Sequence, residues 1–186
     1  MNKTFILFGD SLLSGYGVHF KDAWANNLSS FVNIPVLNKG INGDTTASML
    51  NRFYTDVSLN TPDEIFIMGG TNDLLCGRAV SSIVSNIEEM VKESKCTTYI
   101  GIPPFVVKET AQKLFMPSTL YTYCEDSLPV LRLELIKLCK KYALNYVDFY
   151  TLSKDNLHKD IYIDGIHLNE LGHSLMLKEV LKVVRQ

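Results

Sequence analysis

Short apolar runs alternate with longer amphipathic stretches along the whole chain. The run Phe5-Ile6-Leu7-Phe8 is uninterrupted and rich in residues that favour β-structure, as in a strand buried on both faces. Similar runs recur, so the sequence predicts five strands, at residues 4–8, 35–38, 65–68, 97–102 and 145–149. Between the strands, the pattern predicts the main helices, at residues 22–32, about 44–57, 79–94, 129–142 and 170–184.

Strands that alternate with helices of these lengths predict a parallel sheet with right-handed crossovers and helices on both faces. The expected product is an α/β fold, a three-layer α/β/α sandwich of about five parallel strands. The 186 residues contain no repeat, low-complexity tract or linker. We therefore expect residues 1–186 to form a single domain.

Composition and charge narrow the choice of partners and compartment. Apolar residues make up 46% of the chain, the net charge is −2, and nothing predicts binding to nucleic acid. The first apolar run is too short for a secretory signal, and no run approaches the roughly 18 residues that span a membrane, so we expect no stable membrane insertion. The four cysteines lack metal-ligand spacing and are typical of small buried residues in a reducing compartment. The sequence therefore predicts a cytoplasmic protein without a metal site.

Polar residues gather where the predicted strands end. Ser11 follows the first strand, Gly43 the second and Asn72 the third. Asp164 and His167 lie between the fifth strand and the last helix. In a parallel sheet, every loop that leaves the carboxyl end of a strand opens at the same edge, which is where open α/β sheets bind ligands. We therefore expect these five residues to meet at one edge of the sheet.

These residue types match the needs of acyl transfer from an ester. A serine hydroxyl becomes a nucleophile when a histidine takes its proton, and that histidine needs an acceptor for its other ring N–H. Ser11, His167 and Asp164 can fill these three roles. The backbone N–H groups of Ser11 and Gly43 and the side-chain amide of Asn72 can donate hydrogen bonds to the tetrahedral oxyanion.

Four blocks of the chain resemble those of the GDSL, or SGNH, hydrolase superfamily, in the family's order: Gly9-Asp10-Ser11, Gly40-Ile41-Asn42-Gly43-Asp44, Gly70-Thr71-Asn72-Asp73 and Asp164-Gly165-Ile166-His167. The resemblance spans nearly the whole chain. It implies a flavodoxin-like fold and hydrolysis of small-molecule esters or thioesters through an acyl-serine intermediate, without a cofactor. It implies Ser11 as the nucleophile, His167 as the base and Asp164 as the residue that orients it. It also implies an oxyanion hole formed by Ser11, Gly43 and Asn72.

Three acidic residues within these blocks, in addition to Asp164, are expected to support the site. Asp10 is predicted to hold the turn around Ser11 through hydrogen bonds to nearby backbone N–H groups. Asp73 is predicted to hold the loop that carries Asn72, and Asp44 to cap the helix that follows it.

A long apolar connection after the fourth strand bears on substrate choice. Loops of this length are uncommon unless they are functional. We predict that this connection, with Phe105, Val106 and Phe115, forms an acyl-binding wall or partial lid that admits a short to medium chain, together with Leu74, which closely follows Asn72. The alternative is a small extra helix packed on the sheet edge, with the tyrosines of residues 121–123 covering the core.

Several other interpretations stay open at this point. The loop at residues 11–17 could cradle a phosphate or flavin in a flavodoxin-like binding module, although Asp10 would repel a phosphate. The same residues could transfer the acyl group to an alcohol instead of water. Asp164 and His167 could form a local surface pair or half of a metal site. His173 is a rival base, but its place inside the last helix favours a structural role.

Overall fold

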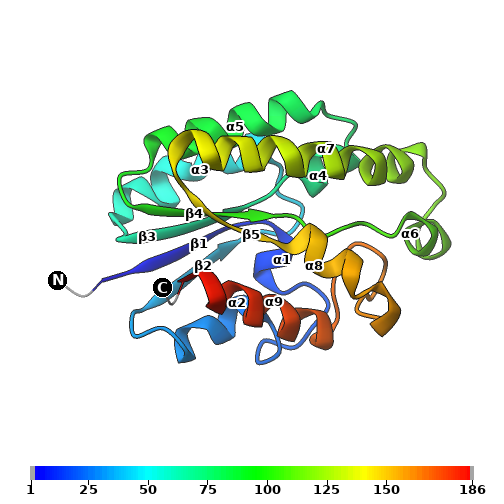
Figure 1. Cartoon of the computed structure of the whole chain (residues 1–186), viewed down its shortest axis with the longest axis horizontal. Helices are drawn as coiled ribbons and strands as arrows, with labels where there is room; N and C mark the ends of the chain where they lie inside the picture. The colour runs from blue at the N-terminus through cyan, green and yellow to red at the C-terminus, as the bar shows by residue number, and fades with distance from the viewer. Residues whose placement is uncertain (1–2, 185–186) are drawn as a thin grey trace.

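The computed structural model describes residues 3–184. Its centre is a sheet of five parallel strands in the order β2-β1-β3-β4-β5, with helices on both faces (Figure 1). The strands are β1 (Phe5–Gly9), β2 (Val36–Gly40), β3 (Glu64–Met68), β4 (Thr97–Ile102) and β5 (Asn145–Asp148). The predicted α/β fold, a parallel sheet of five strands between layers of helices, is therefore confirmed.

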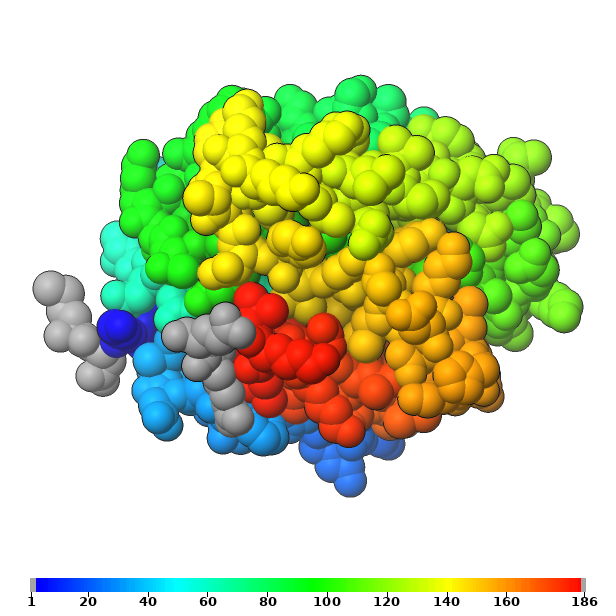
Figure 2. All heavy atoms as spheres, viewed as in Figure 1, coloured from blue at the N-terminus to red at the C-terminus, as the bar shows by residue number. Residues whose placement is uncertain are grey.

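The longer helices divide between the two faces of the sheet (Figure 1). One face carries α3 (Thr46–Asp56), α5 (Val80–Glu93) and α7 (Thr119–Tyr142), and the other carries α2 (Trp24–Asn27) and α9 (Glu170–Val184). The shorter helices are α1 (Ser11–Ser14), α4 (Thr71–Leu75), α6 (Lys108–Leu114) and α8 (Phe149–Asp155), with 3₁₀ turns at Leu28–Ser30, Ser58–Asn60 and Leu157–Lys159. In the space-filling view, α7, α8 and α9 lie side by side across one face of the molecule (Figure 2).

Alternation along β1 sends its side chains into two separate cores. Ile6 and Phe8 pack under α3, α5 and α7, whereas Phe5 and Leu7 pack on the side of α2 and α9. All four side chains are fully buried. Burial on both faces explains why this strand is an unbroken apolar run in the sequence.

The helix predicted over residues 22–32 is shorter in the structure, where α2 ends at Asn27 and a 3₁₀ turn follows. The side-chain amide of Asn26 donates to the carbonyl of Phe20, and that of Asn27 donates to the carbonyl of Lys21. These bonds connect the end of α2 to the loop that precedes it, as asparagine side chains often do with nearby backbone groups.

Helix α7 begins earlier than the sequence predicted. It starts at Thr119, where the Ser118 hydroxyl accepts the N–H of Leu120 at 3.2 Å, and it continues through Pro129. A proline inside a helix costs about 3 kcal/mol or more. Buried residues before and after the proline nevertheless form one stripe: Cys124, Leu128, Leu131, Leu135 and Leu138. Burial of the first part of this stripe offsets the cost, because each buried side chain contributes about 1.5–3 kcal/mol.

The four cysteines differ in their burial. The cysteines are free; Cys124 and Cys139 are buried, as predicted, but Cys96 is only half-buried and Cys76 is exposed at the end of α4.

Within residues 3–184, no helix has both the length and the apolar character needed to cross a membrane.

The extended α7 makes a prediction about stability. Leu128→Ala is expected to lower the free energy of unfolding by about 2–5 kcal/mol, because Leu128 is 1% exposed and its removal leaves a cavity in the core. Leu133→Ala, on the same helix but 53% exposed, is expected to change it by less than about 0.5 kcal/mol. Urea unfolding of both variants measures the difference, and equal losses would contradict this placement of α7.

Candidate active site

The carboxyl end of β1 places Ser11 at the edge of the sheet. Gly9 ends the strand, and a Cβ on it would lie 2.2 Å from the carbonyl oxygen of Met68 in β3, so only glycine fits there. Asp10 then caps α1, since its Oδ1 accepts the N–H of Leu12 at 3.0 Å. Ser11 is the first residue of α1 and is 6% exposed.

A continuous chain of hydrogen bonds, here called the relay, connects Ser11 to His167 and Asp164. Both of these residues lie in the loop before α9, residues 160–169, here called the histidine loop. Ser11 Oγ lies 3.0 Å from His167 Nε2, and His167 Nδ1 lies 2.7 Å from Asp164 Oδ2. Asp164 Oδ1 accepts the backbone N–H groups of Ile166 at 2.9 Å and His167 at 2.7 Å. Burial raises the pKa of Asp164, but these hydrogen bonds outweigh it and hold the pKa below its ordinary value. The carboxylate is therefore ionised and accepts the imidazole N–H.

The segment after β4 holds this histidine loop in place. Val107 N–H donates to the carbonyl of Gly165 at 2.7 Å, and the hydroxyl of Tyr162 donates to the carbonyl of Phe105. Gly165 has a φ of +87°, and a Cβ on it would lie 2.5 Å from the carbonyl oxygen of Val107. Glycine is therefore required at this position, both for the backbone conformation and for the close approach.

Gly43, in the loop after β2, and Asn72, in the short helix after β3, lie beside Ser11. Gly43 has a φ of +76°, and apart from its two chain neighbours no atom of residues 3–184 lies within 4 Å of the position that a Cβ would take. Asn72, in α4, donates through Nδ2 to the carbonyl of Asp44 at 2.9 Å and lies 3.4 Å from Asp10 Oδ2. The amide of Asn72 thus bridges the loop after β1 and the loop after β2.

Two further carboxyl groups beneath the site have different partners. Asp10 is fully buried, and burial is the main cause that raises its pKa to about 7. Asp73 is also buried and accepts both the N–H and the hydroxyl of Thr46, each at 2.8 Å. Asp73 therefore connects the start of α4, which carries Asn72, to the start of α3.

A cleft of about 360 Å³ opens directly beside the relay. Its lining is mostly apolar and comes from α4, the segment between α6 and α7, the start of α7 and the histidine loop: Asn72, Leu75, Phe115, Ser118, Leu120, Tyr121, Ile166 and His167. It therefore combines an apolar wall with polar groups at one end, as small-molecule sites do.

The acyl wall predicted from the sequence changes in composition. Phe115 lines the cleft, but Leu74 and Val106 lie in the core, at 0% and 1% exposed, and Phe105 packs against Tyr150 with ring centroids 5.8 Å apart. Leu74 points inward because consecutive residues of a helix face about 100° apart, so its neighbour Leu75 takes the cleft position. The same connection does contain the small extra helix, α6, but Tyr121 lines the cleft instead of covering the core.

The ring of Tyr16 lies against His167, with the two ring centroids 4.4 Å apart, a contact for which the sequence offered no signal.

The rival base His173 lies in the core and not in the site. It is 2% exposed, and its Nδ1 accepts the backbone N–H of Trp24 at 3.3 Å. Burial lowers the pKa of His173 to about 4. His173 is thus a neutral core residue.

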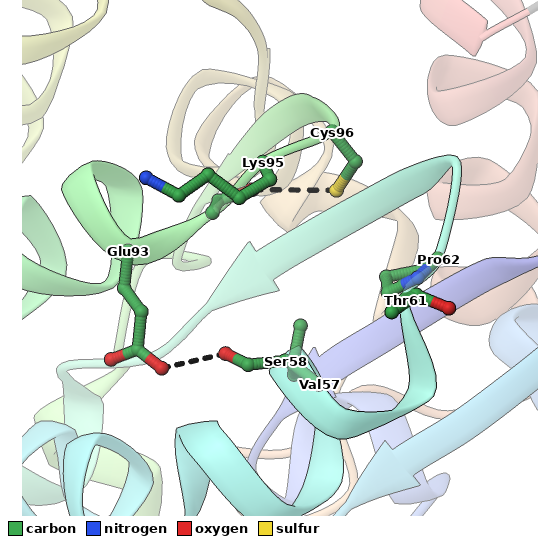
Figure 3. A pocket seen from close by; sticks show the side chains of 8 residues that line it. Val57, Ser58, Thr61, Pro62, Glu93, Lys95 and Cys96 are labelled. Atoms are coloured by element: carbon green, nitrogen blue, oxygen red, sulfur yellow. Dashed lines mark hydrogen bonds between the residues drawn. The ribbon is translucent and has the colours of Figure 1, made fainter.

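A second cavity, of about 300 Å³, lies at the opposite edge of the sheet, where β3 and β4 begin (Figure 3). There Ser58 and Glu93 point toward one another and share a hydrogen bond of 2.6 Å (Figure 3). Burial raises the pKa of the Cys96 thiol in its wall. No histidine lies among the residues that line this cavity, so the serine–histidine pair of the first site is not repeated there. Across residues 3–184, no group of three or more His, Cys, Asp or Glu residues is placed to hold a metal ion.

The sequence of this chain is similar to those of known esterases and lipases. The model of the GDSL-like lipase/acylhydrolase family matches residues 7–175. An arylesterase of Vibrio mimicus is 32% identical over 95 residues, which are 48% of this chain and 48% of the arylesterase. The chain spans about half the length, or less, of the first curated relatives that it matches.

Solved structures show the same fold at low sequence identity. A member of the lipolytic protein G-D-S-L family from Veillonella parvula is 21% identical, with a TM-score of 0.84 and coverage of 99% of both chains. The lipase/acylhydrolase from Enterococcus faecalis is 23% identical, with a TM-score of 0.75 and coverage of 97% of this chain and 94% of the other. Since the family model covers most of its length, this chain belongs to the GDSL-like lipase/acylhydrolase family.

Proposed function

We propose that this protein hydrolyses carboxylic esters or thioesters by acyl transfer to Ser11. The observation that carries the proposal is the continuous relay from Ser11 Oγ to His167 at 3.0 Å and from His167 to Asp164 at 2.7 Å. A serine hydroxyl in this arrangement loses its proton to the imidazole as it attacks a carbonyl carbon. Membership of a lipase/acylhydrolase family supports the same reaction class.

In the first half of the reaction, Ser11 Oγ forms a bond to the acyl carbon while His167 Nε2 takes the serine proton. The tetrahedral intermediate then collapses, and the bond from the acyl carbon to the alcohol oxygen, or to the thiol sulfur, breaks. His167 gives its proton to that leaving group. Asp164 stabilises the imidazolium through the hydrogen bond to Nδ1.

In the second half, water replaces the departed alcohol or thiol. His167 takes a proton from the water as its oxygen attacks the acyl-serine carbon. The bond to Ser11 Oγ then breaks, the carboxylic acid leaves, and His167 returns the proton to Ser11. No cofactor or metal takes part in either half.

Three donors would stabilise the negative oxygen of both tetrahedral intermediates. They are the backbone N–H groups of Ser11 and Gly43 and the side-chain amide of Asn72. An amide nitrogen carries two hydrogens. One is donated to the carbonyl of Asp44 at 2.9 Å. The other makes a long hydrogen bond of 3.4 Å to Asp10 Oδ2 and would turn to the oxyanion when it forms.

The cleft beside the relay indicates the class of acyl group. Its apolar wall, with Leu75, Phe115 and Tyr121, begins next to Asn72 and His167, where the acyl carbon would lie. We infer that a short to medium acyl chain lies along this wall. The volume of about 360 Å³ is at the small end for ligand pockets.

The phosphate- or flavin-binding alternative gains no support from the loop after β1. There Asp10 Oδ1 already accepts the N–H of Leu12, so that this backbone donor is not free to bind a phosphate. A cytoplasmic location stays a prediction, supported by the free cysteines, since thiols persist in reducing compartments.

Labelling tests the nucleophile. A fluorophosphonate probe followed by intact mass measurement is expected to add one label, on Ser11, and Ser11→Ala removes it. That variant is expected to lower kcat on nitrophenyl butyrate by on the order of 10³-fold or more. His167→Ala also loses most of the labelling rate, whereas the exposed control variants Ser29→Ala and His158→Ala keep both properties. A label that persists in Ser11→Ala would refute the assignment.

If an acyl chain lies along the apolar wall of the cleft, kcat/KM depends on the length of that chain. On nitrophenyl esters from acetate to octanoate, kcat/KM is expected to rise until the cleft is filled. The rise is up to about fourfold per CH₂, because each buried CH₂ contributes about 0.8 kcal/mol. Phe115→Ala flattens this rise, and Leu133→Ala, at an exposed position on α7 outside the cleft, leaves it unchanged. Activity confined to acetate would argue against an acyl-binding wall.

The buried carboxyl of Asp10 predicts a dependence of stability on pH. Its pKa is raised from 3.8 to about 7, so between these pH values the folded protein holds a proton that the unfolded chain releases. This group therefore lowers the free energy of unfolding as pH rises, by up to about 1.4 kcal/mol per pH unit. Asp10→Asn is expected to gain stability relative to wild type from pH 4 to pH 8, as measured by urea unfolding.

The control for this measurement is Asp155→Asn, at an exposed position at the end of α8. Its stability relative to wild type is expected to stay constant over the same pH range. If Asp10→Asn also keeps a constant difference from wild type, Asp10 is ionised in the folded protein at pH 4, and the interpretation of its environment fails.

A further inference from the structure

One arginine behind the site donates to four groups at once. Arg52, in α3, has a side chain that is only 16% exposed. Its Nε donates to Asp44 Oδ2 at 2.7 Å, and Nη1 donates to Asp56 Oδ2 at 2.8 Å. Its Nη2 donates to the carbonyl oxygens of Gly9 and Lys39, each at 3.0 Å. Arg52 therefore connects the ends of β1 and β2 to the loop that follows β2.

Only a guanidinium can make this set of contacts. It is planar and carries five N–H donors in a fixed fork, whereas a lysine has one nitrogen on a flexible stem. The guanidinium of Arg52 also lies 4.1 Å over the ring of Phe8, which confines it to one plane. The contacts of Arg52 thus impose geometry as well as charge.

Asp44 is the residue through which this geometry reaches the site. Its backbone N–H donates to the carbonyl of Ile41 at 3.2 Å and closes the turn that contains Gly43. Its carbonyl accepts the amide of Asn72 at 2.9 Å. Its side chain is held by Arg52, so one residue sets both the loop of Gly43 and the orientation of Asn72.

The sequence pointed to another role for Asp44, the cap of α3. In the structure Thr45 is the cap, since its hydroxyl accepts the N–H of Ser48 at 3.3 Å. The carboxylate of Asp44 is therefore available for Arg52.

We propose that Arg52 is a positioning residue for the oxyanion site: acting through Asp44, it holds the N–H of Gly43 and the amide of Asn72 at the angle that receives the negative oxygen. This role rests on the function proposed above. Its hydrogen bonds go to the frame of the site and not to the reacting groups of Ser11 and His167. Because the negative oxygen exists only in the transition state and the tetrahedral intermediates, loss of Arg52 lowers kcat and leaves KM nearly unchanged.

The test compares Arg52→Lys with a matched control, Arg132→Lys. Both variants keep the charge, and Arg132 on α7 pairs with Asp148 at the same distance of 2.7 Å. For Arg52→Lys, kcat per active site on nitrophenyl butyrate is expected to fall by about 10²-fold, as for a misplacement of about 1 Å. The KM is expected to stay within about twofold. Arg132→Lys is expected to leave both values at wild-type levels.

A second readout separates positioning from folding. A trifluoromethyl ketone adds to Ser11 Oγ, whose proton goes to His167, and its carbonyl oxygen becomes a negative oxygen in the oxyanion site. The affinity of Arg52→Lys for this ketone is expected to weaken by the same factor as kcat/KM. Titration with the fluorophosphonate counts the intact sites. A merely structural role would reduce that count and leave kcat per site and ketone affinity unchanged, which would overturn the proposal.

Two further measurements keep the proposal falsifiable if Arg52→Lys folds poorly. Asp44→Asn keeps the backbone and weakens the ion pair, so it is expected to show the same loss of kcat and ketone affinity; wild-type values would overturn the proposal. In NMR spectra, the Gly43 amide and the Asn72 side-chain amide are expected to shift in Asp44→Asn but not in Arg132→Lys. A wild-type protein that takes no label and cleaves no ester overturns the proposed function and this role with it; an active wild type with unaffected variants overturns only the role of Arg52.

Discussion

The hydrogen bond between Ser11 Oγ and His167 Nε2 is the contact on which the rest of the site depends, and it joins residues 156 positions apart. It forms because all strands of the sheet run parallel, so that the loops after β1 and after β5 open at one edge. The central strands β1, β3 and β4 are buried on both faces and cannot slide without exposing one core or the other. Two distant segments therefore meet at a fixed separation, with the hydroxyl and the imidazole held by rigid elements.

The carboxyl groups of Asp164 and Asp10 have pKa values shifted in opposite directions, because their surroundings differ. Asp164 faces His167 and two backbone N–H groups, and its pKa lies below the ordinary value. Asp10 is fully buried, and this burial outweighs the hydrogen bond from Leu12 and the influence of His167, so that its pKa rises to about 7. One group thus serves as the ionised partner of an imidazole, and the other serves as a support for the turn around the nucleophile. The same functional group takes two roles according to burial and neighbours.

Much of the fold could be predicted from local patterns, and the errors have physical causes. Strands such as β1 were recognised because burial on both faces demands an unbroken apolar run. The start of α7 was missed because Pro129 signals a helix start, while the packing of Leu128 against the sheet outweighs that signal. Leu74 was predicted to face substrate, but the rotation of α4 turns Leu74 inward and Leu75 toward the cleft, and this rotation depends on packing and not on residue type.

The sequence by itself determined the order of the elements and which residue types follow each strand, since both are local properties of the chain. It therefore pointed to Ser11, Gly43, Asn72, Asp164 and His167 as one group. Only the tertiary structure decided how that group is supported: that Arg52 holds Asp44 instead of leaving it to cap a helix, and that the backbone of Val107 lies against Gly165. These contacts join segments whose separation and angle arise from the packing of helices on the sheet, and no short stretch of sequence encodes them.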